Sequence, residues 1–287
     1  METLPTYILN VSCPATSGIV AAVSTYLARN DCYIAEMAQF DDDFTERFFM
    51  RTVFRFNPGA SSGIEALRDG FAAVAADFAM QWELYSTARP TRVLLMVSKF
   101  DHCLADLLYR HQKGELPMEI TAIVSNHLEL RAMAEREGIR FVYLPVTKDS
   151  KRQQELELLR LVAETGTELV VLARYMQILS NELCQELAGR AINIHHSFLP
   201  GFKGAKPYHQ AFERGVKLIG ATAHYVTSDL DEGPIIEQEV QRVDHGYRPE
   251  DLVAIGRDTE TVALYKAVKY HIERRLFLNG NRVVVFR

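Results

Sequence analysis

The sequence contains the stretch Ala191-Ile-Asn-Ile-His-His-Ser-Phe-Leu-Pro-Gly-Phe-Lys-Gly204, which predicts a strand and the loop that ends it. Its first residues alternate between apolar and polar, and in a strand residues two apart point to the same face. Asn193 and His195 are therefore expected to project together, while Ile192 and Ile194 pack behind them. The proline and glycines that follow predict a loop, where a rigid sheet usually presents functional groups.

The two polar residues of this strand suit a division of chemical roles. The amide of Asn193 can donate a hydrogen bond to an oxygen that gains negative charge, and His195 can move a proton near neutral pH. A strand with two polar residues on a solvated face is an equally simple interpretation. The spacing alone leaves both open.

A second stretch favours the chemical interpretation. Residues Leu218–Val226 alternate as a strand, and Asp229-Leu-Asp-Glu-Gly-Pro-Ile-Ile236 follows with the composition of a turn. The turn is expected to hold Asp231 at the edge of the sheet, where a carboxylate can orient a histidine or a water molecule.

Three ordered motifs carry a family resemblance. They are Asn-Ile-His-x-Ser-x-Leu-Pro, Gly-Ala-Thr-x-His-Tyr-Val and Leu-Asp-x-Gly-Pro-Ile-Ile. Together they resemble the folate-dependent formyltransferase and formyl-hydrolase family, over most of residues 91–287. The resemblance implies that Asn193, His195 and Asp231 form the catalytic triad.

The resemblance also implies a substrate pocket. The segment Arg174–Ser180 follows an expected strand, and in the family the matching segment lines the pterin pocket largely through backbone groups. Gln177, Ile178 and Leu179 are the residues concerned here. Backbone recognition suits a heterocycle whose edge carries donors and acceptors like those of a peptide.

Two further residues are expected at the substrate. His224 shares a strand face with Thr222 and is interpreted as a supporting residue beside the cleft, although a hydrogen-bonded core histidine fits the same pattern. Gly233, in the turn after Asp231, is assigned to substrate binding through the resemblance.

The first 86 residues predict a separate domain. Strand and helix patterns over residues 6–86 alternate as a ferredoxin-like βαββαβ unit. The layout resembles an ACT domain, which implies an amino-acid effector such as glycine or methionine. Ala15 and Thr16 stand where related modules carry an Asp-Arg pair, and a dimerisation module with no ligand is the alternative.

From Thr91 onward, expected strands and helices alternate. This pattern predicts βαβ units and a Rossmann-like, mostly parallel sheet over residues 91–287. The predicted fold class is therefore α/β, with an ACT-like domain at 1–86 and a formyltransferase-like domain at 91–287. In such sheets the ligand lies beyond the carboxyl ends of the strands, where Asn193 and His195 are expected.

The turn at Lys99–Cys103 favours one branch of the family. Relatives that formylate a phosphorylated amine carry a glycine-rich phosphate turn here, and this chain has no glycine in it. The turn resembles the hydrolase branch, which implies hydrolysis of 10-formyltetrahydrofolate to formate and tetrahydrofolate. Asp101 and His102 are otherwise explained as the first turn of a helix. Transfer of the formyl group to an amine and a non-catalytic folate or amino-acid sensor remain alternatives.

Composition excludes several classes of protein. The net charge of −5 and the pI near 6.0 argue against a nucleic-acid surface. No stretch approaches 18 uninterrupted apolar residues, and no secretory leader is recognised, so a cytoplasmic protein is expected. Cys13, Cys32, Cys103 and Cys184 form no Cys-x-x-Cys pair and are expected to be free, buried thiols.

No metal and no cofactor are expected, since His195 and His196 diverge on a strand and the folate is the substrate. The exposed edges of an ACT-like sheet predict a homo-oligomer. A tetramer is one size that such pairing allows, and the sequence leaves the size open.

Overall fold

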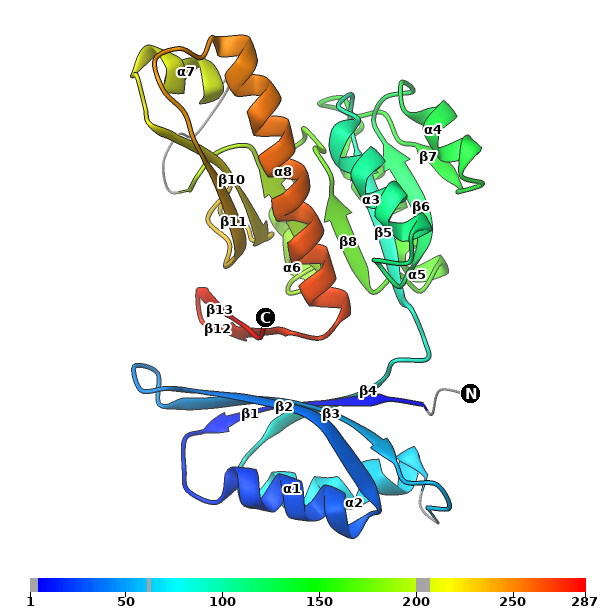
Figure 1. Ribbon diagram of the computed structural model, residues 1–287. Coiled ribbons are helices and arrows are strands. Elements are labelled where there is room, and N and C mark those ends of the chain that lie inside the picture. Colours follow the sequence, from blue (N-terminus) through cyan, green and yellow to red (C-terminus); the bar gives the residue numbers. More distant parts are fainter. Residues whose placement is uncertain (1–4, 61–62, 200–206) are drawn as a thin grey trace. The chain divides into compact units, whose positions relative to one another are not determined.

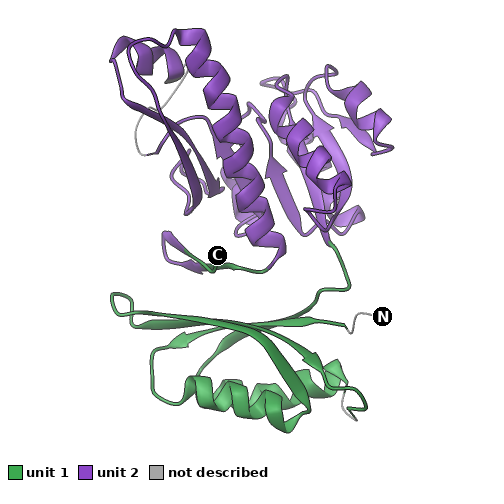
Figure 2. Cartoon of the chain, in the orientation of Figure 1, with its two compact units in different colours: residues 1–90, 274–277, 284–287 green, residues 91–273, 278–283 purple. Residues whose placement is uncertain are grey.

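The computed structural model describes residues 5–60, 63–199 and 207–287, so the loop predicted at Pro200–Gly204 lies outside the described residues. The chain folds as two compact units (Figure 2). The first runs to Pro90 and includes Arg274–Phe277 and Val284–Arg287; the second comprises Thr91–Glu273 and Leu278–Val283. The sequence assigned all of 91–287 to the second domain, whereas these two C-terminal pieces belong to the first unit.

The first unit is the ferredoxin-like fold that the sequence predicted (Figure 1). Its elements are β1 (Tyr7–Pro14), α1 (Ile19–Arg29), β2 (Cys32–Asp42), β3 (Arg47–Phe56), α2 (Ile64–Asp77) and β4 (Gln81–Ser86). The strands form an antiparallel sheet in the order β2-β3-β1-β4, and both helices cover one face. Each helix buries an apolar stripe with a spacing of four residues, Ile19, Val23 and Leu27 in α1.

The C-terminal pieces belong to the first unit because their phenylalanines are buried there. Phe277 and Phe286 form a buried cluster with Phe49 of β3. The side-chain amide of Asn10 donates to the carbonyl oxygen of Arg274 at 3.0 Å. The dipeptide Asn279-Gly280 is a hairpin turn signal in the sequence, but the sequence does not show which surface these phenylalanines cover.

The second sheet of the chain has nine strands and carries helices on both faces (Figure 1). Its strands are β5 (Thr91–Val97), β6 (Met118–Ser125), β7 (Phe141–Tyr143), β8 (Leu169–Leu172), β9 (Ala191–His195), β10 (Leu218–Tyr225), β11 (Ile235–Arg242), β12 (Leu276–Asn279) and β13 (Arg282–Val285). Its helices are α3 (His102–Gln112), α4 (Arg131–Arg136), α5 (Lys151–Glu164), α6 (Asn181–Glu186), α7 (Pro207–Glu213) and α8 (Pro249–Ile272).

The sheet is mostly parallel, as predicted. Its strand order is β12-β13-β11-β10-β9-β8-β5-β6-β7, and the run from β9 to β7 is parallel throughout. β10 pairs antiparallel with both β9 and β11. The antiparallel pairing places the end of β10 beside the start of β9, with Tyr225 opposite Ile192, and the turn between β10 and β11 then brings Asp231 to His195 at the other end of β9.

Two further sequence expectations bear on the fold. All four cysteines are free and buried, as predicted. Among the described helices, none combines the length and the apolar composition needed to span a bilayer.

Candidate active site

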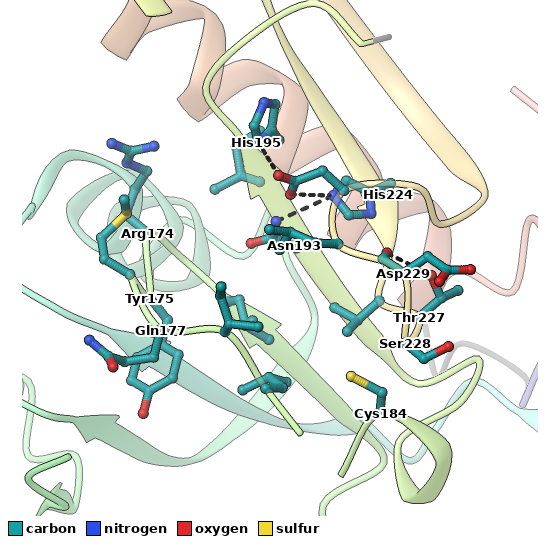
Figure 3. A pocket seen from close by; sticks show the side chains of 18 of the residues that line it. Arg174, Tyr175, Gln177, Cys184, Asn193, His195, His224, Thr227, Ser228 and Asp229 are labelled. Carbon is teal, nitrogen blue, oxygen red and sulfur yellow. Dashed lines mark hydrogen bonds and ion pairs between the residues drawn. The ribbon is translucent and has the colours of Figure 1, made fainter. Parts of the chain in front are cut away.

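A cavity of about 250 Å³ lies beyond the carboxyl ends of β8 and β9 (Figure 3). Asn193 and His195 both line it, as expected for residues two apart on one strand. The antiparallel register pairs Asn193 with His224 of β10, so the three side chains share one face of the sheet. The turn after β10 adds Asp231 to the lining.

Asp231 joins the two histidines. Its Oδ2 lies 3.2 Å from Nδ1 of His195, and its Oδ1 lies 3.7 Å from Nε2 of His224. Since the carboxylate accepts at Nδ1 of His195, the basic nitrogen of the neutral ring is Nε2. This nitrogen lies 3.1 Å from the hydroxyl oxygen of Ser197. We call Asp231, His195, His224 and Asn193 the Asp231 cluster.

His224 is held in one orientation by the backbone. Its Nδ1 lies 2.9 Å from the carbonyl oxygen of Tyr225, which can only accept, so Nδ1 carries a hydrogen. Its Nε2 lies 3.3 Å from Nδ2 of Asn193. A neutral His224 accepts from that amide at Nε2, and a protonated His224 donates to Asp231. His224 therefore links the amide of Asn193 to the carboxylate of Asp231.

The electrostatics keep Asp231 ionised. Burial alone raises the pKa of the Asp231 carboxyl, but hydrogen bonds from His195 and His224 lower it by more, and the resulting pKa lies well below its ordinary value. Near neutral pH this group therefore accepts hydrogen bonds and does not donate them. The neighbouring His196 is also shifted: burial, aided by Arg174, lowers its pKa to about 4 and keeps it neutral.

Backbone geometry fixes the turn that carries Asp231. Asp231 itself has a φ of 57°, in the left-handed region that aspartate tolerates better than most residues. Gly233 allows a close approach: a Cβ there would lie 1.7 Å from the carbonyl oxygen of Tyr225. Gly233 does not belong to the lining of the cavity among the described residues. Its part in substrate binding stays a prediction, whereas the close packing against Tyr225 explains why a glycine is needed at this position.

One wall of the cavity is the segment Arg174–Ser180, here called the pocket loop. Gln177, Ile178 and Leu179 line the cavity, where the sequence expected them. Within the described chain, their backbone N–H and C=O groups make no hydrogen bond to the protein. They are therefore available to a ligand that carries peptide-like donors and acceptors.

A second polar cluster lies beside the pocket loop and was not recognised from the sequence. Glu260 of α8 is only 1% exposed. Its Oε2 lies 2.7 Å from Nε2 of His102 and 3.3 Å from Nε of Arg174, the latter an ion pair without hydrogen-bond geometry. Its Oε1 accepts from the hydroxyl of Tyr208 at 2.9 Å. We call these four residues the Glu260 cluster.

A sequence signal for Glu260 did exist. The buried positions of α8 include Leu252, Gly256, Thr259, Glu260 and Ala263, so this glutamate falls on the apolar stripe of its helix. A charged residue on such a stripe needs a buried partner. The partners come from elements far away in the sequence, so the sequence could not name them.

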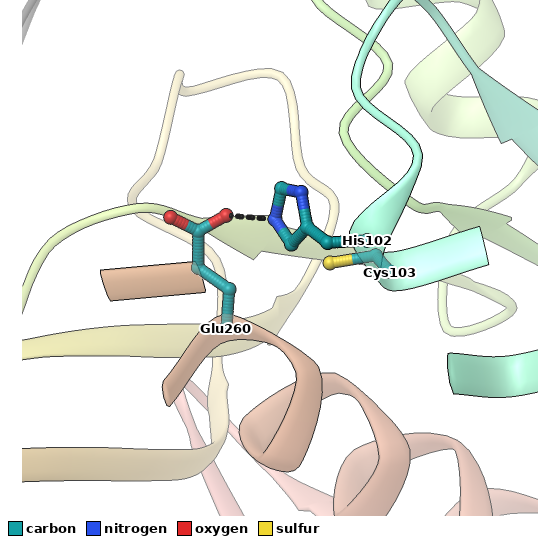
Figure 4. Close-up of side chains that lie close together, drawn as sticks. All are labelled: His102, Cys103 and Glu260. Carbon is teal, nitrogen blue, oxygen red and sulfur yellow. Dashed lines mark hydrogen bonds and ion pairs between the residues drawn. The ribbon is translucent and has the colours of Figure 1, made fainter. Parts of the chain in front are cut away.

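Metal binding was considered for the same region. Among the described residues, His102, Cys103 and Glu260 offer three ligand atoms within 4.8 Å of one another (Figure 4). The arrangement suits a metal poorly. The cation of Arg174 already pairs with the carboxylate, and burial holds the pKa of Cys103 well above its ordinary value, so the thiol keeps its proton.

Comparison with known proteins agrees with this geometry. Residues 91–268 match the family described as Formyl transferase, which gives the class of the second unit. Formyltetrahydrofolate deformylase from Corynebacterium sp. (strain P-1) is 54% identical over 98% of both chains.

Solved structures give the same result. The deformylase structure from Burkholderia mallei is 56% identical, with a TM-score of 0.94 over 99% of this chain and 100% of the other. That from Pseudomonas putida is 50% identical, with a TM-score of 0.92 over 98% and 100%. The chain therefore belongs to the formyltetrahydrofolate deformylase family.

Proposed function

We propose that the protein hydrolyses 10-formyltetrahydrofolate to formate and tetrahydrofolate, and so supplies formate and free tetrahydrofolate to purine and one-carbon metabolism. Full-length similarity to formyltetrahydrofolate deformylases supports the reaction. The observation that carries the proposal is the convergence of Asn193, His195 and Asp231 on one cavity. No cofactor is needed for this reaction, because water is the second substrate.

The pocket loop is proposed to bind the pterin. The unpaired backbone groups of Gln177, Ile178 and Leu179 match a heterocycle edge that alternates donors and acceptors. His224 is proposed as a supporting residue at the reactive end of this pocket, since it contacts both Asn193 and Asp231.

Asn193 is proposed to stabilise the transition state. Water attacks the formyl carbon, and the carbonyl oxygen becomes an oxyanion. Nδ2 of Asn193 has two hydrogens, and His224 takes at most one, so the other can be donated to that oxygen. Loss of one such donor costs roughly 10²–10³ in rate.

His195 and Asp231 are proposed to move the protons as a pair. The carboxylate holds Nδ1–H of His195, so Nε2, which faces the hydroxyl of Ser197, is the basic nitrogen. The proton taken from water then passes to the leaving folate nitrogen as the C–N bond breaks, so the products are formic acid and the secondary amine. Acid–base assistance of this kind contributes roughly 10²–10⁴ in rate.

The test is formate release from 10-formyltetrahydrofolate in buffer without any amine. Wild type should release formate, and Asn193→Ala and Asp231→Ala should each lose most of the rate. Absence of formate from a protein that still binds tetrahydrofolate would contradict the hydrolase. Formyl transfer to an added amine would then identify a transferase, and binding without any turnover would identify a sensor.

The first unit is proposed to be an ACT-type regulatory domain that binds glycine or methionine. A cavity of about 700 Å³ lies at the β1–α1 turn, lined by Ala15, Thr16 and Asp41 among others. Asp41 is the charged residue of this lining and could receive an ammonium group. Titration of either amino acid against the rate of formate release tests the proposal; a rate unaffected by both would contradict it.

The assembly and the compartment are further proposals. The ACT-like sheet has edge strands suited to pairing between copies, which supports a homo-oligomer, and a tetramer is one size that such pairing allows. The pI near 6.0 and the four free thiols support a cytoplasmic protein that binds neither nucleic acid nor membranes. Light scattering on the full chain measures the assembly.

A further inference from the structure

The pocket loop is anchored at both ends by buried carboxylates from two helices. At its start, Arg174 forms an ion pair with Glu260 of α8. At its end, the backbone N–H of Ser180 donates to Oε1 of Glu155 of α5 at 2.8 Å. Glu155 is 7% exposed and Glu260 is 1% exposed. Carboxylates are rarely buried unless they are paired, and the loop supplies one partner to each of these two glutamates.

Neutral side chains hold the residues between these two ends. The hydroxyl of Tyr175 accepts from the side-chain amide of Gln154 at 3.2 Å. The backbone N–H of Met176 donates to the hydroxyl of Ser98 at 2.9 Å, and that hydroxyl donates to Asn126 at 2.7 Å. Anchoring therefore stops at Met176 and resumes at Ser180.

The three residues left between the anchors face the cavity, and their backbone groups make no hydrogen bond to the described part of the protein. A loop with fixed ends and an unpaired middle is preorganised for a ligand. Its conformational entropy is lost when the protein folds, so little more is lost when the ligand binds.

The first residue of the loop, Arg174, has an unfavourable backbone conformation and a buried charge, and both need compensating contacts. Arg174 has a φ of 66°, in the left-handed region that a long side chain rarely adopts. Its guanidinium lies over the ring of Phe100, with the central carbon 5.1 Å from the ring centroid, and it is 92% buried. Glu260 supplies the negative charge that makes this buried position tolerable.

We propose that Glu260 and Glu155 are positioning residues that hold the pocket loop in its substrate-binding conformation. The two carboxylates act by different means. Glu260 compensates a buried cation, so its charge is required. Glu155 accepts from a neutral N–H, so an acceptor oxygen is sufficient. The proposal rests on the proposed function for the identity of the ligand, a reduced folate.

The experiment compares four variants of the full-length protein by steady-state formate release and by the Kd for tetrahydrofolate. Glu260→Gln and Glu155→Leu are expected to raise KM and Kd about 10-fold and to keep kcat within about threefold, because the binding surface is loosened while the Asp231 cluster is unchanged. Glu155→Gln keeps an acceptor and should stay within about twofold of wild type. Glu260→Asp retains the charge and should recover part of the affinity.

Matched controls lie on the same two helices. Asp258→Asn on α8 and Glu164→Gln on α5 each remove one exposed carboxylate and should leave KM and Kd unchanged. Thermal unfolding identifies any variant that fails to fold. Wild-type KM and Kd in both folded Glu260→Gln and Glu155→Leu would overturn the proposal, as would an equal loss in Glu155→Gln and Glu155→Leu.

The binding measurement separates this proposal from the proposed function. If wild type binds tetrahydrofolate but releases no formate, the hydrolase is contradicted. A higher Kd in Glu260→Gln and Glu155→Leu would still support the positioning role in that case.

Discussion

Two carboxylates, the half-buried Asp231 and the buried Glu260, have similar surroundings and different expected uses. Asp231 contacts His195 and His224, and Glu260 contacts His102 together with Arg174 and Tyr208. Burial raises the pKa of both carboxyls, and their hydrogen bonds and charged neighbours lower both pKa values by more, so both stay ionised.

Asp231 and Glu260 differ in their access to the cavity and in the groups that compensate their negative charge. Asp231 lines the cavity, and the groups that it contacts are histidines, a residue type that can take up and release a proton during a reaction. Glu260 lies outside the lining and pairs with a guanidinium, which stays charged at all relevant pH values. A carboxylate beside titratable partners in a cavity suits proton transfer, whereas one paired with arginine inside the protein suits positioning.

The largest expected effect separates these two uses directly. Asp231→Asn should lower kcat on the order of 10³-fold with little change in KM, because it removes the negative charge beside His195 and replaces one of the two acceptor oxygens that face His195 and His224 by a donor. Glu260→Gln, an equally conservative change, should keep kcat within about threefold. Steady-state formate release measures both. Equal losses of kcat in the two variants would remove the distinction between the clusters.

A smaller effect concerns the packing that seals the Glu260 cluster. A Cβ at Gly256 would lie 2.1 Å from the ring of Tyr208, so Gly256→Ala should lower the free energy of unfolding by about 1–3 kcal/mol. Ala254→Gly, at an exposed site on the same helix, measures helix propensity alone and should cost about 1 kcal/mol. Chemical denaturation gives both values. A stabilised Gly256→Ala would show that Tyr208 is not tightly packed there.

The smallest expected effect is the pH dependence of stability. The folded-state pKa values of Asp231 and Glu260 lie below the ordinary values of about 4, so the unfolded chain binds more protons as the pH falls. Their contribution is present above about pH 4 and is lost progressively below it. The free energy of unfolding of Asp231→Asn should therefore fall less steeply than that of wild type between about pH 4 and pH 2. Parallel curves for the two proteins would contradict the lowered pKa of Asp231.

Much of the architecture could be predicted from local sequence patterns. The alternation in residues 6–86 gave the ferredoxin-like unit, because strand and helix periodicities are local properties of the chain. The spacing of Asn193 and His195 placed both on one strand face, and the turn composition placed Asp231 near them. Residues of the pocket loop were reached only through the family resemblance, since composition alone showed a half-apolar loop.

The antiparallel direction of β10 could not be predicted from local sequence patterns. The alternation of β10 identifies a strand but not its direction, and pairing with β9 depends on the register of two segments 23 residues apart in the chain. That register brings His224 opposite Asn193, and it could be known only from the folded sheet.

By itself the sequence determined the elements, the order of the two domains and the catalytic candidates, because these follow from periodicity and from short motifs. The tertiary structure decided which charges meet. Glu260 reaches Arg174 and His102 across 86 and 158 residues of chain, and Glu155 reaches the N–H of Ser180 across 25. The energy of a buried charge depends on its neighbours in space, and those neighbours exist only after the sheet and its helices have packed.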